Sequence, residues 1–257
     1  MPLLQEMTWP RVEAALRRSD LVVVPIGSTE QHGPHLPLAT DFLVAAHIAK
    51  RVGERLEAVV APVLPFGYAP YHLDFAGTIT LDEATLRAAL LQLCRSLLRH
   101  GARHFLVVNG HGGNTASAES VALELAGQGA LCAVSQWWEL ARELNPAWGH
   151  GDFSHAGVVE TAVVLAICPE ACDLAALRPT TLTPLSANIR SEYASRFRFG
   201  KGTVSVRVPM RRLSATGNLG EVDPALATSE LGREILESIV DYLVAFGKEF
   251  ATVPTGG

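Results

Sequence analysis

Short apolar runs alternate with longer segments of helical periodicity through the first two thirds of this 257-residue chain. Four runs are rich in small or β-branched residues and are bounded by Gly, Pro or polar residues: 21–26 (LVVVPI), 58–63 (AVVAPV), 105–109 (FLVVN) and 130–135 (ALCAVS). Continuous apolar runs of this length are typical of strands that are buried on both faces. Because helical segments separate them, we predict an α/β fold, a three-layer α/β/α sandwich with a mostly parallel central sheet.

The helical segments are recognised by apolar residues that recur every three or four positions. The spacing predicts helices over 41–56, 83–100, 158–167 and 229–250, and one that begins near residue 114. Between residues 196 and 208 an alternating pattern around Gly-Lys-Gly predicts a hairpin. No internal repeat or Ser/Gly/Pro-rich linker divides the chain, so we expect a single domain over residues 1–257.

Composition excludes several classes of protein. With 48% hydrophobic and 18% charged residues, the chain is not expected to be disordered. No apolar run approaches the roughly 18–20 residues that span a bilayer, and no signal peptide is evident. A net charge of −5 argues against nucleic acid as a partner, and the four cysteines form no CxxC pair. We therefore expect a cytoplasmic protein with no membrane or nucleic-acid partner.

The segment that follows the first predicted strand, GSTEQHGPHLPLATD, holds three candidate metal ligands. Glu30 and His32 are two residues apart, so in an extended stretch their side chains leave the same side of the backbone. Asp41 opens the next predicted helix. A carboxylate and an imidazole suit a divalent cation, but a polar turn with Asp41 as a helix cap explains the same residues.

Two further loops carry chemistry of the same kind. His111 lies in the segment NGHGGN between a predicted strand and helix, where a glycine-rich turn could equally cradle a phosphate through its backbone N–H groups. In HAGVVET, His155 precedes a strongly apolar helix whose first turn contains Glu160. Glu160 is either a charge matched to the helix dipole or a buried carboxylate that needs a partner.

Glu30, His32, Asp41, His111 and Glu160 together supply two imidazoles and three carboxylates. This inventory suits two divalent ions that share a bridging carboxylate. It contains no thiolate, so it does not predict a structural zinc site of the cysteine type. The chain also contains neither HExxH nor GxSxG, which argues against the zincin and α/β-hydrolase classes.

The three motifs together resemble those of the creatininase (creatinine amidohydrolase) family, most closely the mycofactocin-associated peptidases and the archaeal formamide deformylases. The resemblance covers roughly residues 21–168, with weaker similarity in FAGTITL and GEVDPALAT. It implies a three-layer α/β/α fold, a centre of two divalent metals and hydrolysis of amide-type C–N bonds. It also implies a homo-oligomer, commonly a hexamer.

By motif position, the resemblance implies that Glu30 binds one metal and His32 the other. Asp41 would bridge the two, and His111 would complete the protein ligands of the first metal. His155 corresponds to the histidine that handles protons, with Glu160 beside it as ligand or catalytic base. The ions would be Zn, Mn or Fe, since ligands of this kind suit all three.

Two positions depart from the creatinine-hydrolysing members. They carry a glutamate ligand where this chain has Gly113, and Glu160 is our candidate for the missing carboxylate. They also carry a substrate-stacking tryptophan where this chain has Gly151, so creatinine is not the expected substrate. Three nearby tryptophans, none at that position, are Trp137, Trp138 and Trp148.

We therefore predict a metal-dependent amidohydrolase that acts through a metal-bound hydroxide on a small amide, such as a cyclic amide, a formamide or a short peptide. In this hypothesis His155 passes a proton to the departing nitrogen. An alternative is a non-catalytic metal-binding assembly subunit of the same fold. A third interpretation is a metal-free protein that binds a phosphate ligand at the NGHGGN turn.

Overall fold

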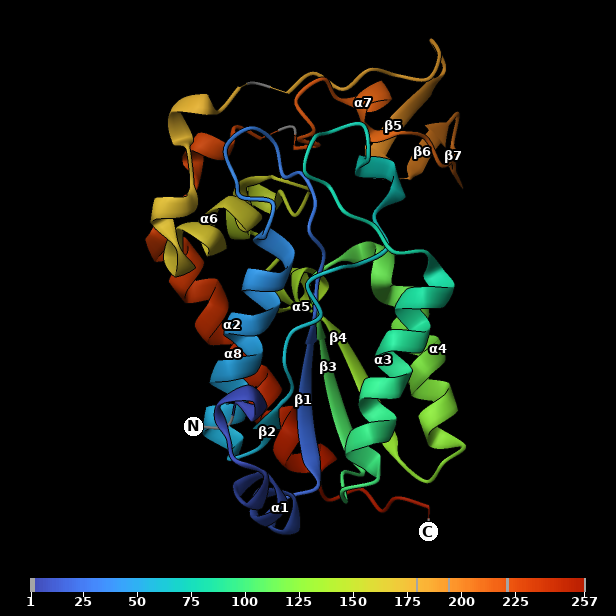
Figure 1. Cartoon of the computed structure of the whole chain (residues 1–257). Helices are drawn as coiled ribbons and strands as arrows, with labels where there is room; N and C mark the ends of the chain where they lie inside the picture. The colour runs from blue at the N-terminus through green and yellow to red at the C-terminus, as the bar shows by residue number, and fades with distance from the viewer. Residues whose placement is uncertain (1–2, 179, 194, 221, 257) are drawn as a thin grey trace.

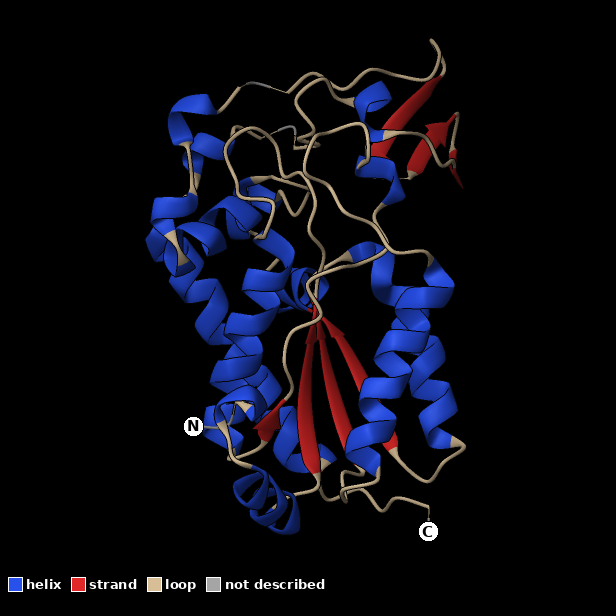
Figure 2. Cartoon of the chain, viewed as in Figure 1, coloured by secondary structure: helices blue, strands red, loops and turns tan. Residues whose placement is uncertain are grey.

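The computed structural model describes residues 3–178, 180–193, 195–220 and 222–256. A parallel four-stranded sheet in the order β2-β1-β3-β4 forms its centre (Figure 2). The strands are β1 (Leu21–Ile26), β2 (Val59–Val60), β3 (His104–Asn109) and β4 (Leu131–Gln136). β1 and β3 are buried along their whole length, as continuous apolar runs predict. They end level with each other, because Ile26 lies opposite Asn109.

Helices cover both faces of the sheet, which confirms the predicted α/β sandwich (Figure 1). One layer contains α2 (Thr40–Leu56), α6 (Val158–Ile167) and α8 (Ser229–Phe250), with α5 (Trp137–Leu144) beside them. The other contains α3 (Glu83–Leu98) and α4 (Thr115–Ala126), with α1 (Trp9–Arg18) towards the β2 edge. Successive side chains of β1 point to opposite faces of the sheet and enter different apolar cores. Val23 packs with α2 on one face, and Val24 packs with α3 and α4 on the other.

The second strand is shorter than the predicted run 58–63. β2 is only Val59–Val60, and a single further bridge joins Leu64 to β1. Pro62 and Pro65 interrupt this edge of the sheet, because proline has no backbone N–H to donate. Helices α1 and α5, which the periodicity did not predict, are short elements of ten and eight residues.

A small antiparallel sheet lies beyond the carboxyl ends of the central strands (Figure 1). The hairpin expected within 196–208 is present as β6 (Arg196–Phe199) and β7 (Gly202–Ser205), and β5 (Ile189–Tyr193) pairs with β6. Phe197 is fully buried and packs with residues of α7 (Met210–Leu213). This separate apolar cluster fixes the small sheet above the region where we expect the site.

Among the residues described, no helix has both the length and the apolar character needed to cross a bilayer.

Candidate metal centre and active site

The predicted ligands converge at the carboxyl ends of β1 and β3, where parallel α/β sheets form their sites. Glu30 and His32 lie in the loop after β1, and Asp41 is in the first turn of α2. His111 follows β3, and Glu160 is in the first turn of α6. Three segments far apart in the sequence thus bring one cluster of side chains together.

Glu30, Asp41 and His111 form a first group of possible ligands, with one atom of each within 4.8 Å of the others. His111 Nδ1 lies 3.1 Å from Glu30 Oε2 and 3.2 Å from Asp41 Oδ2. All three residues are buried. Their donor atoms therefore face a common point.

His32, Asp41 and Glu160 form a second group within the same limit. His32 Nε2 lies 2.9 Å from Asp41 Oδ1 and 3.7 Å from Glu160 Oε2. Asp41 belongs to both groups and offers a different oxygen to each. His155 forms a further combination with Glu30 and His32, and its Nδ1 lies 3.9 Å from Glu30 Oε1.

Several of these buried atoms have no hydrogen-bond partner among the residues described. They are both carboxylate oxygens of Glu30, Asp41 Oδ2 and His32 Nε2. Burying polar atoms without partners costs free energy, and bound cations would compensate that cost. Asp41 is also not the cap of its helix, because the N-cap position is Ala39 and no side chain caps it. The donor set therefore fits divalent cations better than a polar turn.

Backbone carbonyl groups hold the two histidines in a metal-binding form. Nδ1–H of His32 donates to the carbonyl oxygen of Glu30 at 3.1 Å, and Nε2–H of His111 donates to that of Tyr68 at 2.9 Å. We assign these tautomers because a carbonyl oxygen can only accept. In the neutral rings that ligate a cation, His32 Nε2 and His111 Nδ1 are then the nitrogens without a proton, and both face the carboxylates. Such outer hydrogen bonds are typical of metal-ligating histidine.

The electrostatics of the metal-free centre reflect its concentrated charge. Burial acts to raise the pKa of Glu30, but the imidazoles of His111 and His72 outweigh it and hold that pKa well below its usual range. Burial acts to lower the pKa of His32, but the Asp41 carboxylate raises it to about 10. Burial raises the pKa of Glu160 to about 7. Without cations, the imidazoles therefore compensate the carboxylates.

Gln31 and His72 belong to the site although the sequence did not assign them ligand or catalytic roles. The Gln31 amide donates to His72 Nδ1 at 2.8 Å and to the Gly217 carbonyl at 3.1 Å. His155 Nε2–H donates to the backbone carbonyl oxygen of Gln31 at 2.7 Å. A Cβ at Gly217 would lie 1.8 Å from Gln31 Oε1, so this contact requires glycine. The alternation Glu30–Gln31–His32 could have shown that the middle side chain points away from its neighbours.

A cavity of about 560 Å³ opens onto this cluster. Five of the six predicted site residues line it, namely Glu30, Asp41, His111, His155 and Glu160. His32 is completely buried and is not part of the lining. Of the three tryptophans near Gly151 in sequence, Trp138 lines the cavity, whereas the ring N–H of Trp148 donates to Glu234 at 2.9 Å.

No side chain can be accommodated at Gly113 as this chain is folded. A Cβ there would lie 2.1 Å from the Tyr68 carbonyl oxygen and 2.5 Å from His111 Nε2. The resemblance of the sequence motifs implies a glutamate at this position in the creatinine-hydrolysing members. Glu160 reaches the centre from α6 instead, and the backbone N–H of Ala156 donates to its Oε2 at 2.6 Å.

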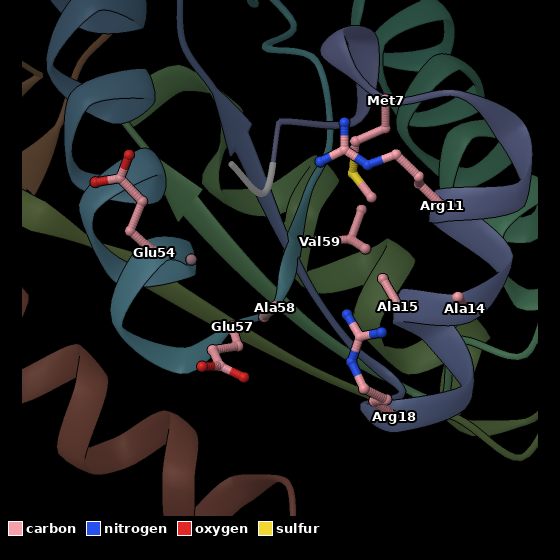
Figure 3. Close-up of a pocket in the computed structure, with 10 residues that line it drawn as sticks. Met7, Arg11, Ala14, Ala15, Arg18, Glu54, Glu57, Ala58 and Val59 are labelled. Atoms are coloured by element: carbon pink, nitrogen blue, oxygen red, sulfur yellow. The ribbon is translucent and has the colours of Figure 1, made fainter.

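A second cavity, of about 470 Å³, lies between α1 and the carboxyl end of α2 (Figure 3). Arg11 and Arg18 lie on its α1 side, opposite Glu54 and Glu57. Its lining contains no histidine or cysteine, and it reaches Val59 at the start of β2. It is therefore at the opposite end of the sheet from the candidate centre.

Curated relatives share most of the chain. Creatinine amidohydrolase from Pseudomonas putida is 36% identical over 189 residues, which is 66% of this chain and 73% of that protein. Mycofactocin precursor peptide peptidase from Mycobacterium tuberculosis (strain ATCC 25618 / H37Rv) is 34% identical over 255 residues, which is 93% of this chain and 88% of that protein. The sequence therefore resembles relatives of different named activity.

Solved creatininases share the fold. The crystal structure of creatinine amidohydrolase (creatininase) matches with a TM-score of 0.77 and 29% identity and covers 98% of this chain and 99% of its own. A manganese creatininase matches with a TM-score of 0.76 and 30% identity over 97% of this chain and 98% of its own. A Zn–Zn creatininase mutant matches with a TM-score of 0.75 and 30% identity and covers 96% of this chain and 98% of its own. The family model of creatinine amidohydrolase matches residues 5–246, so the chain belongs to the creatininase family.

Proposed function

We propose that this chain is an amidohydrolase that uses two divalent cations to cleave a C–N bond of a small amide or short peptide. The observation that carries the proposal is the position of Asp41, which is shared by two groups of ligands in which four buried atoms, of Glu30, His32 and Asp41, lack hydrogen-bond partners among the residues described. Zn–Zn and manganese forms of similar creatininases support the choice of cation.

We assign Glu30, Asp41 and His111 to one cation and His32, Asp41 and Glu160 to the other. When bound, such cations acidify a water molecule and polarise a carbonyl oxygen. In the neutral rings that ligate a cation, the hydrogen bonds to backbone carbonyl groups place the proton on His32 Nδ1 and on His111 Nε2, so that His32 Nε2 and His111 Nδ1 are the ligating nitrogens. Zinc, manganese and iron all suit this donor set.

His155 is the proton carrier in this proposal. Its Nε2–H is bound to the Gln31 carbonyl, so Nδ1 carries the lone pair. Burial, with His32 and His72 nearby, lowers the pKa of His155 well below its usual range, so the ring is neutral at pH 7. Nδ1 can accept a proton from water as the water oxygen bonds to the carbonyl carbon. It then returns that proton to nitrogen as the C–N bond breaks.

The cavity supports a small-molecule substrate. Its volume of about 560 Å³ lies within the usual range for small-molecule sites. The stacking tryptophan of the creatinine-hydrolysing proteins is replaced by Gly151, which does not line the cavity. The peptidase relatives, which are similar over 93% of this chain, support an amide or peptide substrate.

Metal analysis combined with hydrolysis assays tests the proposal. The wild-type protein should bind two equivalents of metal and hydrolyse at least one member of a panel of lactams, formamides, ureido compounds and short peptides. Asp41→Asn should lose both equivalents and the activity, whereas Glu160→Gln should lose one equivalent. Hydrolysis that persists in metal-free protein would contradict the mechanism. Two bound metals without turnover of any compound would favour the assembly-subunit alternative.

A further inference from the structure

Arg207 places a positive charge at the rim of the same cavity. It follows β7, lines the cavity, and holds its guanidinium 5.2 Å from the centre of the Tyr71 ring. Tyr71 directly precedes His72, whose Nε2 lies 3.4 Å from Glu30 Oε1. The guanidinium of Arg207 thus contacts the residue next to His72, which lies close to the candidate metal ligand Glu30. Stacking on an aromatic ring orients the plane of the guanidinium.

Arg211 provides an internal comparison, because it makes the same kind of contact four residues later. Its guanidinium lies 4.2 Å from the centre of the Phe75 ring, and its Nε and Nη2 donate to the Asp74 carbonyl at 3.3 and 3.0 Å. Arg211 does not line the cavity. Its hydrogen bonds hold α7 to the 70–75 segment, so its role is structural.

Arg207 differs in having no such acceptor. Within the described parts of the chain, no carboxylate or carbonyl group pairs with its guanidinium, and the residue is exposed. Its five N–H donors are therefore available to a ligand. A planar guanidinium with free donors matches the two oxygens of a carboxylate or phosphate.

Three carboxylates line the same cavity as Arg207. Glu83 at the start of α3, Glu119 in α4 and Glu139 in α5 all line it. An anionic group would be repelled by these carboxylates and attracted to Arg207. The cavity thus favours one orientation of a charged substrate.

We infer that Arg207 binds an anionic group of the substrate, a carboxylate or a phosphate, at a distance from the amide that is cleaved. The inference rests on the proposed function, since it concerns the substrate of the same centre. It makes the preferred substrate an anionic amide, such as an N-acyl amino acid, a peptide with a free carboxyl end or a phosphorylated formamide. The role of Arg207 is to set specificity rather than to take part in the chemistry.

The test compares anionic probes with neutral probes of the same length, in the wild type and in variants of Arg207 and Arg211. N-formyl derivatives of ω-amino acids with two to six carbons scan the spacing, each paired with its neutral carboxamide. N-formylethanolamine phosphate, paired with N-formylethanolamine, tests the phosphate. Calorimetric titration of metal-loaded protein measures binding, and hydrolysis of the same probes is followed in parallel. Circular dichroism checks that each variant is folded.

Wild-type protein should bind the best anionic probe at least about tenfold more tightly than its neutral partner, because hydrogen bonds between charged groups typically contribute that much. Arg207→Gln should abolish this preference, and Arg211→Gln should retain it. Whichever pair shows the preference identifies carboxylate or phosphate as the bound group.

Equal binding of anionic and neutral probes by the wild type would overturn the inference, as would loss of the preference in Arg211→Gln to the same degree as in Arg207→Gln. The proposed function fails in a different way. If no compound is hydrolysed although the Arg207-dependent preference is present, the anion site stands and the catalytic proposal falls. If hydrolysis occurs without that preference, only the inference is refuted.

Discussion

Substitution of Gly113 by alanine should weaken metal binding, although Gly113 is not itself a ligand. The new methyl group would lie 2.1 Å from the Tyr68 carbonyl oxygen and 2.5 Å from His111 Nε2. These two atoms are the partners of the 2.9 Å hydrogen bond that orients His111. The substitution therefore acts on the bond that keeps His111 Nδ1 free for the cation.

The size of the effect follows from the geometry. Carbon atoms of this kind do not approach other atoms closer than 3.0 Å, so the Tyr68 carbonyl must move by at least the difference, 3.0 − 2.1 = 0.9 Å. A shift of that size breaks or misdirects the hydrogen bond. Loss of such an outer bond typically lowers metal affinity by about 10- to 100-fold. The crowding should also cost about 1–3 kcal/mol of stability.

Gly112 offers a matched control in the same short helix, Gly112–Asn114. The nearest atom to a Cβ at Gly112 is Trp138 Cζ2 at 3.8 Å, which is an ordinary contact. Gly112→Ala should therefore bind metal like the wild type. Competition with a chromophoric chelator for zinc measures affinity, and elemental analysis measures stoichiometry. If Gly113→Ala binds zinc as tightly as Gly112→Ala, the hydrogen bond to Tyr68 does not support the centre and our reasoning is wrong.

Three further predictions concern the stability of the protein. Metal added at about 100 times its dissociation constant should stabilise the metal-free protein by about 2.7 kcal/mol, measured by calorimetry, and no shift would argue against a native metal site. In metal-free protein the pKa of Glu160 rises from 4.5 to about 7 on folding, so the folded protein holds the proton of this carboxyl group more tightly than the unfolded chain does. The stability that this proton contributes is complete below pH 4.5 and is lost as the pH rises through 7. The unfolding free energy of wild type relative to Glu160→Gln should therefore fall by roughly 3 kcal/mol over that interval, and a flat difference would contradict the burial effect. Gln31→Leu should cost about 1–3 kcal/mol in urea unfolding because it leaves His72 Nδ1 without its donor, whereas Gln92→Leu at an exposed helix position should change stability by less than about 0.5 kcal/mol.

Local patterns predicted most of the fold. The helices at 158–167 and 229–250 have the predicted limits, and β1 covers the predicted run 21–26. Periodicity is a property of neighbouring residues, so it could be recognised without any tertiary contact. The prediction was wrong for 58–63, where Pro62 and Pro65 end the pairing early at an edge of the sheet.

The loops of the candidate site were also recognisable, because Glu30, His111 and Glu160 each lie just beyond a predicted strand or at the start of a predicted helix. Their chemical type predicted a metal centre before any distance was known. Their individual roles as ligands, and the expected hexamer and cytoplasmic location, stay predictions. The metal analyses of Asp41→Asn and Glu160→Gln test the roles as ligands.

What the sequence determined by itself is the set of elements and the kinds of side chain that follow them, because short-range periodicity and turn chemistry are encoded by adjacent residues. Only the tertiary structure decided which atoms meet: the two oxygens of Asp41 facing different partners, Gln31 reaching Gly217, and Arg207 stacking on Tyr71. These contacts join residues separated by up to 186 positions. They depend on the order and register of the strands and on the docking of the small sheet, which no local pattern specifies.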